Sequence, residues 1–351
     1  VGGVTMGGGA PVVVQSMTTP PSTDVAATLG QVRELARLGA EVVRVAVPGM
    51  DSAGALPALL EDTPVPLVAD VHFDADLAMA ALDAGIHKLR LNPGNIRRVA
   101  DVERIARRAA ELAVPIRVGV NSGSVPGDLR ERYGGVCVDS MWAAAERHVV
   151  MLEKLGFHDI VLSLKASDPG LTVEANERAS RERGYPIHLG VTEAGTPLSG
   201  SVRTAVAFTR LLDRGIGDTV RVSLAGSPEP EPLVAWEILS ALGLRSGFVR
   251  VVGCPTCARA RLDVGDLAGR VEEALRGLRG SLTVAVMGCE VNGPGEAREA
   301  DVAVIATPAG YLLFSEGEMV RRLCEDELLP AVRDEVDRLL AAGHYNQGGT
   351  A

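Results

Sequence analysis

The chain has 351 residues, 46% of them hydrophobic, and a formal net charge of −10 at pH 7. A chain of this length can form one large core and a second, smaller domain. The acidic balance and the aromatic content of only 3% argue against a nucleic-acid or acidic-membrane surface, because such surfaces are basic and bases stack on aromatic rings.

No apolar run approaches the roughly 20 residues that span a bilayer. The opening stretch VGGVTMGGGAPVVVQSMTT lacks the basic start and apolar core of a signal peptide, so a cytoplasmic location is predicted. Three of the five cysteines cluster, at 254, 257 and 289. This pattern favours thiolate ligands in a reducing compartment over a disulfide framework.

Short β-branched segments alternate with amphipathic stretches from Val12 to about Leu242. Eight strands are predicted, at 12–17, 42–47, 66–72, 88–92, 115–121, 159–165, 186–193 and 219–226. The stretches between them, such as TLGQVRELARLGA, carry apolar residues at helical spacing. Eight strand–helix units predict an α/β fold of the closed (β/α)8 type, a TIM barrel, with an open doubly wound sheet as the alternative.

The pattern then changes to that of a compact α+β domain. Strand-like VRVVG and LTVAVMG lead to Cys254 and Cys289, with a helix predicted between them. DVAVIAT and YLLFSEGE are predicted strands, and ELLPAVRDEVDRLLAAG is a predicted closing helix. EMVRRLCEDELL is also predicted to be helical, with Cys324 as a small core residue. We therefore predict a barrel domain at 1–243 and a second domain at 249–351.

Five predicted barrel strands carry a cation among apolar residues: Arg44, Arg90, Arg117, Lys165 and Arg221. Parallel barrel strands are covered on both faces, so a charge there must be paired or face the barrel mouth. Side-chain alternation puts small or polar residues on the same faces, among them Asn92, Asn121 and Ser223. These faces are therefore expected to point into the mouth.

The carboxylates expected at the mouth are Asp70, with His72 beside it, and Glu193. Five cations against two anions leave a positive surplus, which a diphosphate would neutralise. The glycine loops at 92–96 and 121–124 add backbone N–H groups at helix starts. The alternative is that each cation is a structural clamp for a carboxylate elsewhere.

Cys254, Cys257 and Cys289 supply three soft metal ligands. A structural zinc site needs a fourth cysteine or histidine, and no histidine lies near these cysteines in the sequence. Cys137 and Cys324 are expected to be buried and inert. An iron–sulfur cluster can be held by thiolates and leave one iron for an exchangeable oxygen ligand. The cluster is favoured, and zinc stays open as the alternative.

Two carboxylates are candidates for the fourth ligand. Glu290 neighbours Cys289 directly and is expected to point away from it along an extended strand. Glu296 follows the turn predicted at Gly293-Pro-Gly295, which brings the chain back toward Cys289. Glu296 is therefore the favoured ligand.

The chain resembles the bacterial 4-hydroxy-3-methylbut-2-enyl diphosphate synthase family of the methylerythritol phosphate route to isoprenoids. The resemblance covers nearly the whole length, in one order. It is carried by VQSMTT, GAEVVRVAVP, VADVHF, KLRLNPGNI, IRVGVNSGS, LSLKAS, HLGVTEAG, GIGDTVRVSL, CPTCARARLDV and VAVMGCEVNGPGEAREADV.

The resemblance implies a TIM barrel followed by a small 4Fe–4S domain that resembles part of sulfite reductase. The family substrate is 2-C-methyl-D-erythritol 2,4-cyclodiphosphate, whose ring is opened and reductively dehydroxylated with two electrons to (E)-4-hydroxy-3-methylbut-2-enyl diphosphate. The family also implies a homodimer, with the cluster domain of one subunit over the barrel mouth of the other. Ferredoxin or flavodoxin would donate the electrons.

The resemblance also implies residue roles. The cluster ligands would be Cys254, Cys257, Cys289 and Glu296, the last also counted as catalytic. Glu193 would be the acid that protonates the departing oxygen or a carbanion-like intermediate, and Asp70 and His72 would orient the substrate. The implied diphosphate clamp consists of Arg44, Arg90, Arg117, Asn121, Lys165, Arg221 and Ser223.

The sequence departs from the family pattern at several points. Glu290 replaces a valine beside the cluster, a lysine usual before Leu312 is missing from ATPAGY, and GNIR replaces GNIG. Two other function classes remain: a redox-silent phosphate-ester lyase or transferase with a zinc-bound tail, and an iron–sulfur sensor or carrier. The last leaves the five strand-end cations without a ligand.

Overall fold

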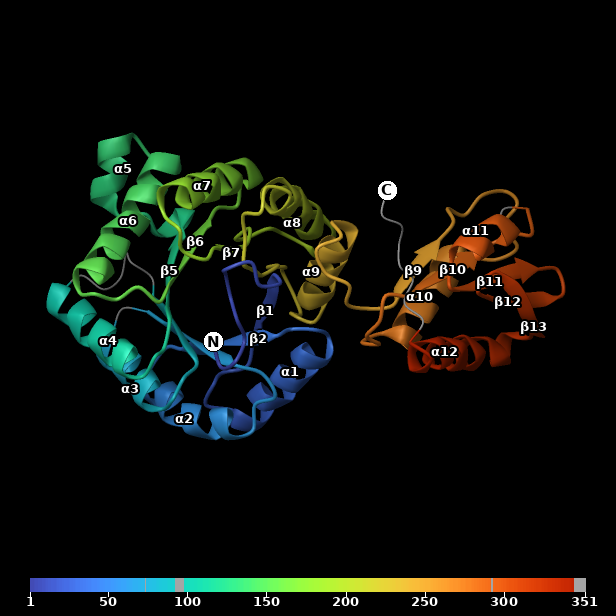
Figure 1. Cartoon of the computed structure of the whole chain (residues 1–351), viewed down its shortest axis with the longest axis horizontal. Helices are drawn as coiled ribbons and strands as arrows, with labels where there is room; N and C mark the ends of the chain where they lie inside the picture. Colours follow the sequence, from blue (N-terminus) through green and yellow to red (C-terminus); the bar gives the residue numbers. More distant parts are fainter. Residues whose placement is uncertain (73, 92–97, 292, 344–351) are drawn as a thin grey trace. The chain divides into compact units, whose positions relative to one another are not determined.

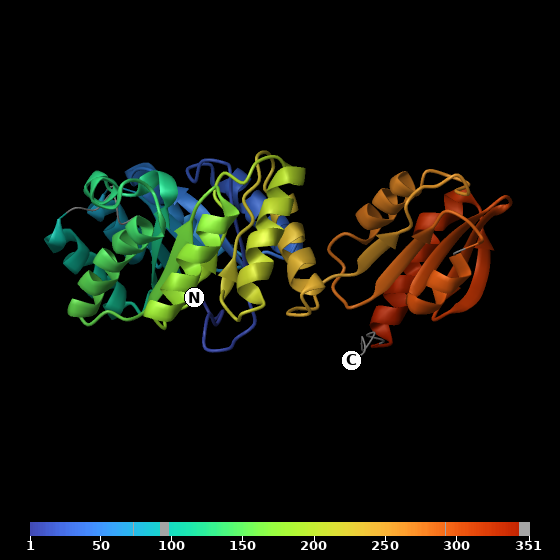
Figure 2. The same ribbon diagram turned by 90° about the horizontal axis from the view of Figure 1, so that it is seen from above.

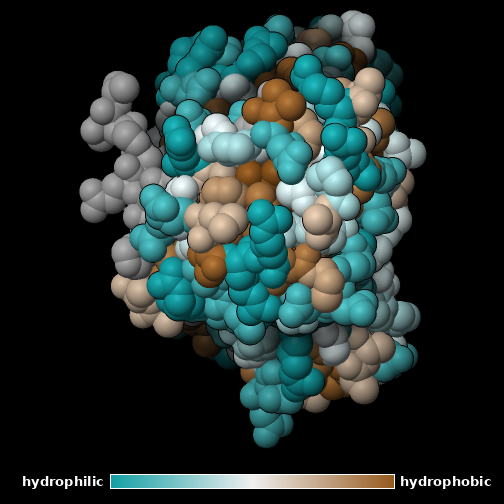
Figure 3. All heavy atoms as spheres, turned by 90° about the vertical axis from the view of Figure 1, so that its right-hand side faces the viewer, coloured by the Kyte–Doolittle hydropathy of each residue, from teal (hydrophilic) through white to brown (hydrophobic). Residues whose placement is uncertain are grey.

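The computed structural model describes residues 1–72, 74–91, 98–291 and 293–343. The chain forms two compact units, Val1–Arg245 and Ser246–Ala351 (Figure 1). Figure 3 shows one face of the surface, on which hydrophobic side chains lie in small patches among hydrophilic ones. Every helix in the described ranges is too short or too polar to cross a membrane.

The first unit is a parallel eight-stranded barrel ringed by helices (Figures 1 and 2). Its strands are β1 (Val13–Met17), β2 (Val42–Val47), β3 (Leu67–Val71), β4 (Lys88–Leu91), β5 (Ile116–Asn121), β6 (Ile160–Lys165), β7 (His188–Leu189) and β8 (Thr219–Val220). They pair in the order β6-β5-β4-β3-β2-β1-β8-β7, and a parallel bridge between Leu162 and Ile187 joins the two ends. The predicted TIM barrel is confirmed.

Helices cover the barrel because each presents an apolar stripe to the strands. In α4, Val102, Ile105, Ala106 and Ala109 are buried at the i, i+3, i+4 and i+7 positions. The helices and one 3₁₀ turn are α1 (Val25–Arg37), α2 (Met50–Glu61), α3 (Ala75–Asp83), α4 (Val99–Glu111), η1 (Ser122–Ser124), α5 (Gly127–Tyr133), α6 (Val138–Lys154), α7 (Pro169–Glu182), α8 (Pro197–Leu212) and α9 (Pro230–Ala241).

The last two barrel strands are much shorter than predicted. Only two residues of 186–193 and two of 219–226 form regular ladder pairs. After Leu189 the chain leaves the sheet at Gly190 and turns, with Glu193 at a φ of 51°. Glu193 therefore lies in a turn beyond β7, and its predicted position in the strand is wrong.

The second unit is a five-stranded sheet with the order β13-β12-β11-β10-β9. Val284 and Val286 of β10 pack on α10 and α12, whereas Ala285 and Met287 pack on the other face near α11. The elements are β9 (Arg250–Gly253), α10 (Val264–Leu275), β10 (Thr283–Met287), α11 (Gly293–Glu299), β11 (Val302–Thr307), β12 (Gly310–Ser315), β13 (Glu318–Leu323) and α12 (Glu325–Ala341).

The helix predicted over EMVRRLCEDELL is wrong in its first half, which is strand β13. Glu316 and Gly317 adopt φ values of 51° and 83°, and this two-residue turn folds 318–323 back on β12. Cys324 is then the exposed residue before α12, not a core residue. The spacing of apolar residues in this segment fits either a helix or a strand. The segment is a strand because the preceding turn places it beside β12.

Candidate active site

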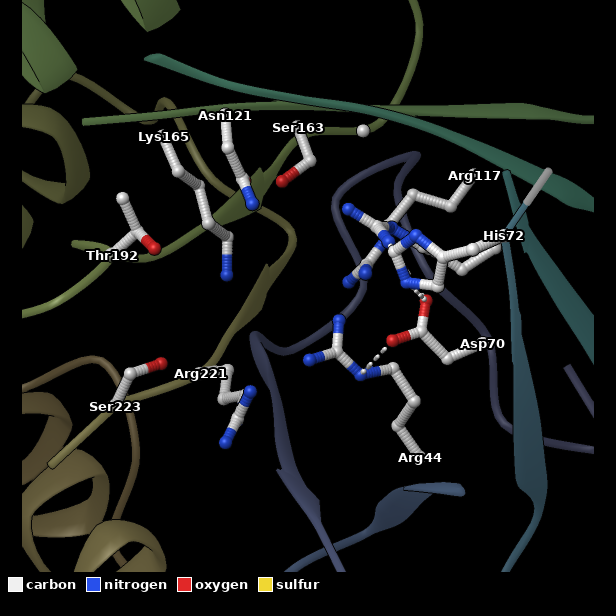
Figure 4. Close-up of a pocket in the computed structure, with 12 residues that line it drawn as sticks. Arg44, Asp70, His72, Arg117, Asn121, Ser163, Lys165, Thr192, Arg221 and Ser223 are labelled. Carbon is white, nitrogen blue, oxygen red and sulfur yellow. Dashed lines mark hydrogen bonds and ion pairs between the residues drawn. The ribbon is translucent and has the colours of Figure 1, made fainter. Parts of the chain in front are cut away.

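A cavity of about 200 Å³ lies at the carboxyl ends of the barrel strands (Figure 4). This is the end at which TIM barrels carry their active sites. The cavity is smaller than the roughly 300–1,000 Å³ typical for drug-sized ligands, and its wall is almost entirely polar. It is lined by Arg44, Asp70, His72, Arg90, Arg117, Gly119, Asn121, Ser163, Lys165, Thr192, Arg221 and Ser223.

All five predicted strand-end cations line this one cavity, from five different strands or strand ends. Among the described residues, Nε and Nη1 of Arg117 have no hydrogen-bond partner, although the residue is only 2% exposed. Burial, followed by the charges of Arg44 and Arg90, lowers the pKa of Arg117 well below its usual value. Unpartnered buried donors cost about 1–3 kcal/mol each, so the cavity favours an anionic ligand.

Asp70 is the acidic centre of the cavity wall. Its carboxylate accepts a hydrogen bond from Nη1 of Arg90 at 2.9 Å and lies 3.6 Å from Nε of Arg44. Nε2 of His72 is 3.4 Å away. Burial raises the pKa of Asp70, but Arg44, His72 and Arg90 together outweigh burial and hold the pKa well below its usual range. Asp70 therefore stays ionised and orders one side of the cation cluster.

Glu231, in the first turn of α9, is a second buried carboxylate that the sequence analysis missed. It is 3% exposed, lies 3.3 Å from Nε of Arg221, and accepts hydrogen bonds from Ser16 Oγ and Leu224 N at 3.3 and 3.1 Å. In the sequence it stands in the proline-rich stretch SPEPEP, which gives no sign of burial. Its position is decided by the packing of α9 against the barrel.

The remaining predicted site residues divide into those inside and those outside the cavity. Asn121, Ser223 and His72 line it, and Ser163 and Thr192 are additional lining residues that were not predicted. Glu193 follows Thr192 directly but is exposed and not part of the lining. The glycine loop predicted at 92–96, with Asn92, lies outside the described residues.

The three clustered cysteines lie at the carboxyl ends of two neighbouring strands of the second unit. Cys254 follows β9 and Cys289 follows β10, which pairs with β9 in parallel. The backbone N–H of Gly288 donates a hydrogen bond to Sγ of Cys254 at 3.3 Å. Cys254 is partly buried, Cys257 exposed and Cys289 buried, and all five cysteines, each within the described ranges, lack a disulfide.

The cysteine set fits a soft metal centre by its chemistry. Cys254 and Cys289 follow the carboxyl ends of two strands that pair in parallel, and the backbone N–H of Gly288 donates to Sγ of Cys254, as backbone amides do to the sulfurs of iron–sulfur sites. Among the described residues, no three Cys, His, Asp or Glu side chains lie close enough together to hold a metal ion. The residues present are therefore compatible with a cluster, without a preformed cage.

Both candidate carboxylates near the cysteines are exposed. Glu296 lies in the first turn of α11, and the N–H of Gly293 donates to the carbonyl of Cys289 at 3.2 Å. The predicted turn at Gly293-Pro-Gly295 is therefore the start of a helix, because proline suits the first helical turn. Glu290 directly follows Cys289, in a turn and not in an extended strand as predicted.

Fold and site define a TIM-barrel protein with a cationic, anion-binding cavity at the carboxyl ends of its strands, followed by a sheet domain with three clustered cysteines. The chain belongs to the GcpE family. The model of the GcpE TIM-barrel domain matches residues 1–236, and the model of the GcpE protein C-terminal domain matches residues 250–338.

Full-length relatives agree with this assignment. Proteins named 4-hydroxy-3-methylbut-2-en-1-yl diphosphate synthase (flavodoxin) are 48% identical in Geobacter sulfurreducens, covering 98% of both chains, and 44% identical in Halalkalibacterium halodurans, covering 97% of this chain and 92% of the relative. The predicted family, and with it the oxidoreductase class, is confirmed.

The solved structures show a likeness of fold alone. Dihydropteroate synthase from Yersinia pestis, in complex with a sulfonamide drug, is 10% identical and has a TM-score of 0.50. The match covers 68% of this chain and 99% of that chain.

Proposed function

We propose that this chain binds 2-C-methyl-D-erythritol 2,4-cyclodiphosphate in the cation-lined cavity and reduces it to (E)-4-hydroxy-3-methylbut-2-enyl diphosphate, a step of isoprenoid biosynthesis. The single observation that carries the proposal is Arg117, a buried guanidinium with two nitrogens lacking a partner among the described residues. Among the described residues that line this cavity there are four other cations, and Asp70 is the one carboxylate. A compact diphosphate matches this surplus of charge.

In the proposed reaction the ring opens at a bond between carbon and a diphosphate oxygen, and one hydroxyl leaves as water. Two electrons and one proton balance the conversion of the dianionic substrate to the trianionic product and water. Arg44, Arg117 and Arg221 would hold the diphosphate, and Asn121 and Ser223 would orient it by hydrogen bonds. Glu193 is the proposed acid, since it adjoins the lining residue Thr192.

We propose that residues 1–243 bind the substrate and residues 249–351 hold a 4Fe–4S cluster through Cys254, Cys257, Cys289 and the carboxylate of Glu296. The bound cluster would supply the electrons one at a time. The names of the relatives specify flavodoxin, which favours flavodoxin over ferredoxin as the donor here. A homodimer that brings the cluster of one subunit to the cavity of the other completes the proposal.

The test uses anaerobically purified full-length protein. It should contain about four irons per chain and convert the cyclic diphosphate only when a reduced flavodoxin is supplied. Stoichiometric zinc, or turnover without any reductant, would contradict the proposal. Arg117→Met should weaken substrate binding strongly, whereas the exposed Arg98→Met should not.

A further inference from the structure

Lys165 and His188 form a buried pair, and the proposed reaction gives His188 no role. Lys165 ends β6, His188 begins β7, and the two residues are 7% and 0% exposed. Nζ of Lys165 lies 3.1 Å from Nε2 of His188, and Nδ1 of His188 lies 3.4 Å from Oγ1 of Thr219. These contacts fit a neutral imidazole that donates from Nδ1 to Thr219 and accepts from Lys165 at Nε2.

The pair sits among cations and lacks a carboxylate. In the described part of the chain Lys165 has no ion-pair partner, and the two acids nearby, Asp70 and Glu231, are engaged by arginines. Burial, then Arg117, Arg221, Arg44 and Arg90, lower the pKa of Lys165 well below its usual value. Burial, then Lys165, Arg117, Lys88 and Arg44, lower the pKa of His188.

Gly190 leaves space in the cavity wall for the amine of Lys165. A Cβ atom at Gly190 would lie 2.3 Å from Nζ of Lys165 and 2.9 Å from the carbonyl oxygen of Arg221. The absence of a side chain at 190 therefore lets Lys165 reach both His188 and the cavity, which it lines. An anion in the cavity would lie within direct electrostatic range of this amine.

We propose that Lys165, held against the ring of His188, takes up a proton when the cyclic diphosphate enters the cavity. The inference rests on the proposed function, whose substrate is the ligand. Before binding, cationic neighbours and burial disfavour the ammonium form; the dianion reverses that balance. His188 acts as a positioning residue that accepts a hydrogen bond from the amine.

Titration calorimetry on the oxidised holoenzyme, without a reductant, tests the proposal directly. The cyclic diphosphate keeps a constant charge near neutral pH because each of its phosphates has one strongly acidic hydroxyl. Binding heats in buffers of different ionisation enthalpy should report uptake of about 0.3–1 proton per chain at mildly alkaline pH. Uptake should decline as the pH falls toward the pKa of the unliganded amine.

Three variants locate the proton. Lys165→Met should abolish uptake. Lys88→Met, which removes the other buried lysine, and His188→Gln, which keeps an acceptor for the amine, should both retain it. Binding of the wild type without proton uptake would overturn the inference, as would uptake that survives Lys165→Met or disappears in either of the other two. Absence of any binding by the wild type would instead refute the proposed function.

Discussion

Glu231 and Arg221 form a buried ion pair that connects the start of α9 with the end of β8. Nε of Arg221 lies 3.3 Å from the carboxylate, and the two side chains are 15% and 3% exposed. The same carboxylate accepts a hydrogen bond from the N–H of Leu224. Glu231 thereby restrains the segment that carries both Arg221 and Ser223 into the cavity, without lining the cavity itself.

Glu231→Gln should loosen this restraint. The variant removes the charge that pairs with Arg221 but keeps the side-chain shape and a hydrogen-bond acceptor, so we expect the unfolding free energy to fall by about 1–3 kcal/mol. KM for the cyclic diphosphate should rise about tenfold with a smaller change in kcat, because the effect is on the binding of the anion. The exposed Glu229→Gln is the matched control and should change neither; equal effects of the two variants would contradict this role.

Arg117→Met should separate stability from binding. Removing this buried guanidinium, two nitrogens of which lack a partner among the described residues, should raise the unfolding free energy of the ligand-free protein by about 1–2 kcal/mol. The same change should weaken binding of the cyclic diphosphate by at least about tenfold, since a charge-assisted contact is lost. Denaturant unfolding and calorimetry measure the two effects. A stability loss with unchanged binding would show that Arg117 is a structural clamp.

Asp70→Asn should destabilise the protein by an amount that does not change with pH between pH 8 and pH 5. The folded-state pKa of Asp70 lies below the unfolded value of about 3.9, so its contribution is full above that value and is lost as the pH falls through the folded pKa. The difference in unfolding free energy between wild type and variant should therefore be constant from pH 8 to pH 5. Asp334→Asn on the exposed face of α12 serves as control. A difference that shrinks between pH 8 and pH 6 would disprove this account.

Gly190→Ala should disturb the cavity through sterics alone. The added methyl group would collide with Lys165 and with the backbone carbonyl of Arg221, so displacement of the amine should weaken binding of the cyclic diphosphate severalfold. Gly184→Ala, where a Cβ meets no atom within 4 Å, should bind normally. Calorimetry should measure the affinity of both alanine variants for the cyclic diphosphate. Equal affinities would show that a methyl group at position 190 does not displace the amine of Lys165.

Removal of single thiols should separate cluster ligands from other cysteines. Cys289→Ser should lose most of the iron and the visible absorption of the anaerobic protein, because only two thiolates would remain. Cys324→Ser, at the exposed start of α12, should retain both. Iron retained in full by Cys289→Ser would remove that residue from the proposed ligand set.

Much of the barrel could be predicted from local pattern. The β-branched runs and the apolar stripe spacing depend only on neighbouring residues, and the predicted β2 agrees with the observed Val42–Val47. Side-chain alternation also placed Arg44, Arg90 and Arg117 on the inner faces, where they line the cavity. The predictions for the end of β7 and for the segment that forms β13 were wrong. The chain leaves the sheet at Gly190, and the two-residue turn at Glu316 and Gly317 folds the next segment back as a strand, although its apolar spacing also fits a helix.

The sequence by itself determined the family, the eight strand–helix units and the residues that bring positive charge to the barrel mouth, since these follow from motif order and local periodicity. Only the tertiary structure decided that Glu231 is buried against Arg221, that His188 meets Lys165, and that Glu193 stays outside the cavity wall. Contacts of this kind join residues of different elements. Their distances depend on how strands and helices close around one another, which no local pattern encodes.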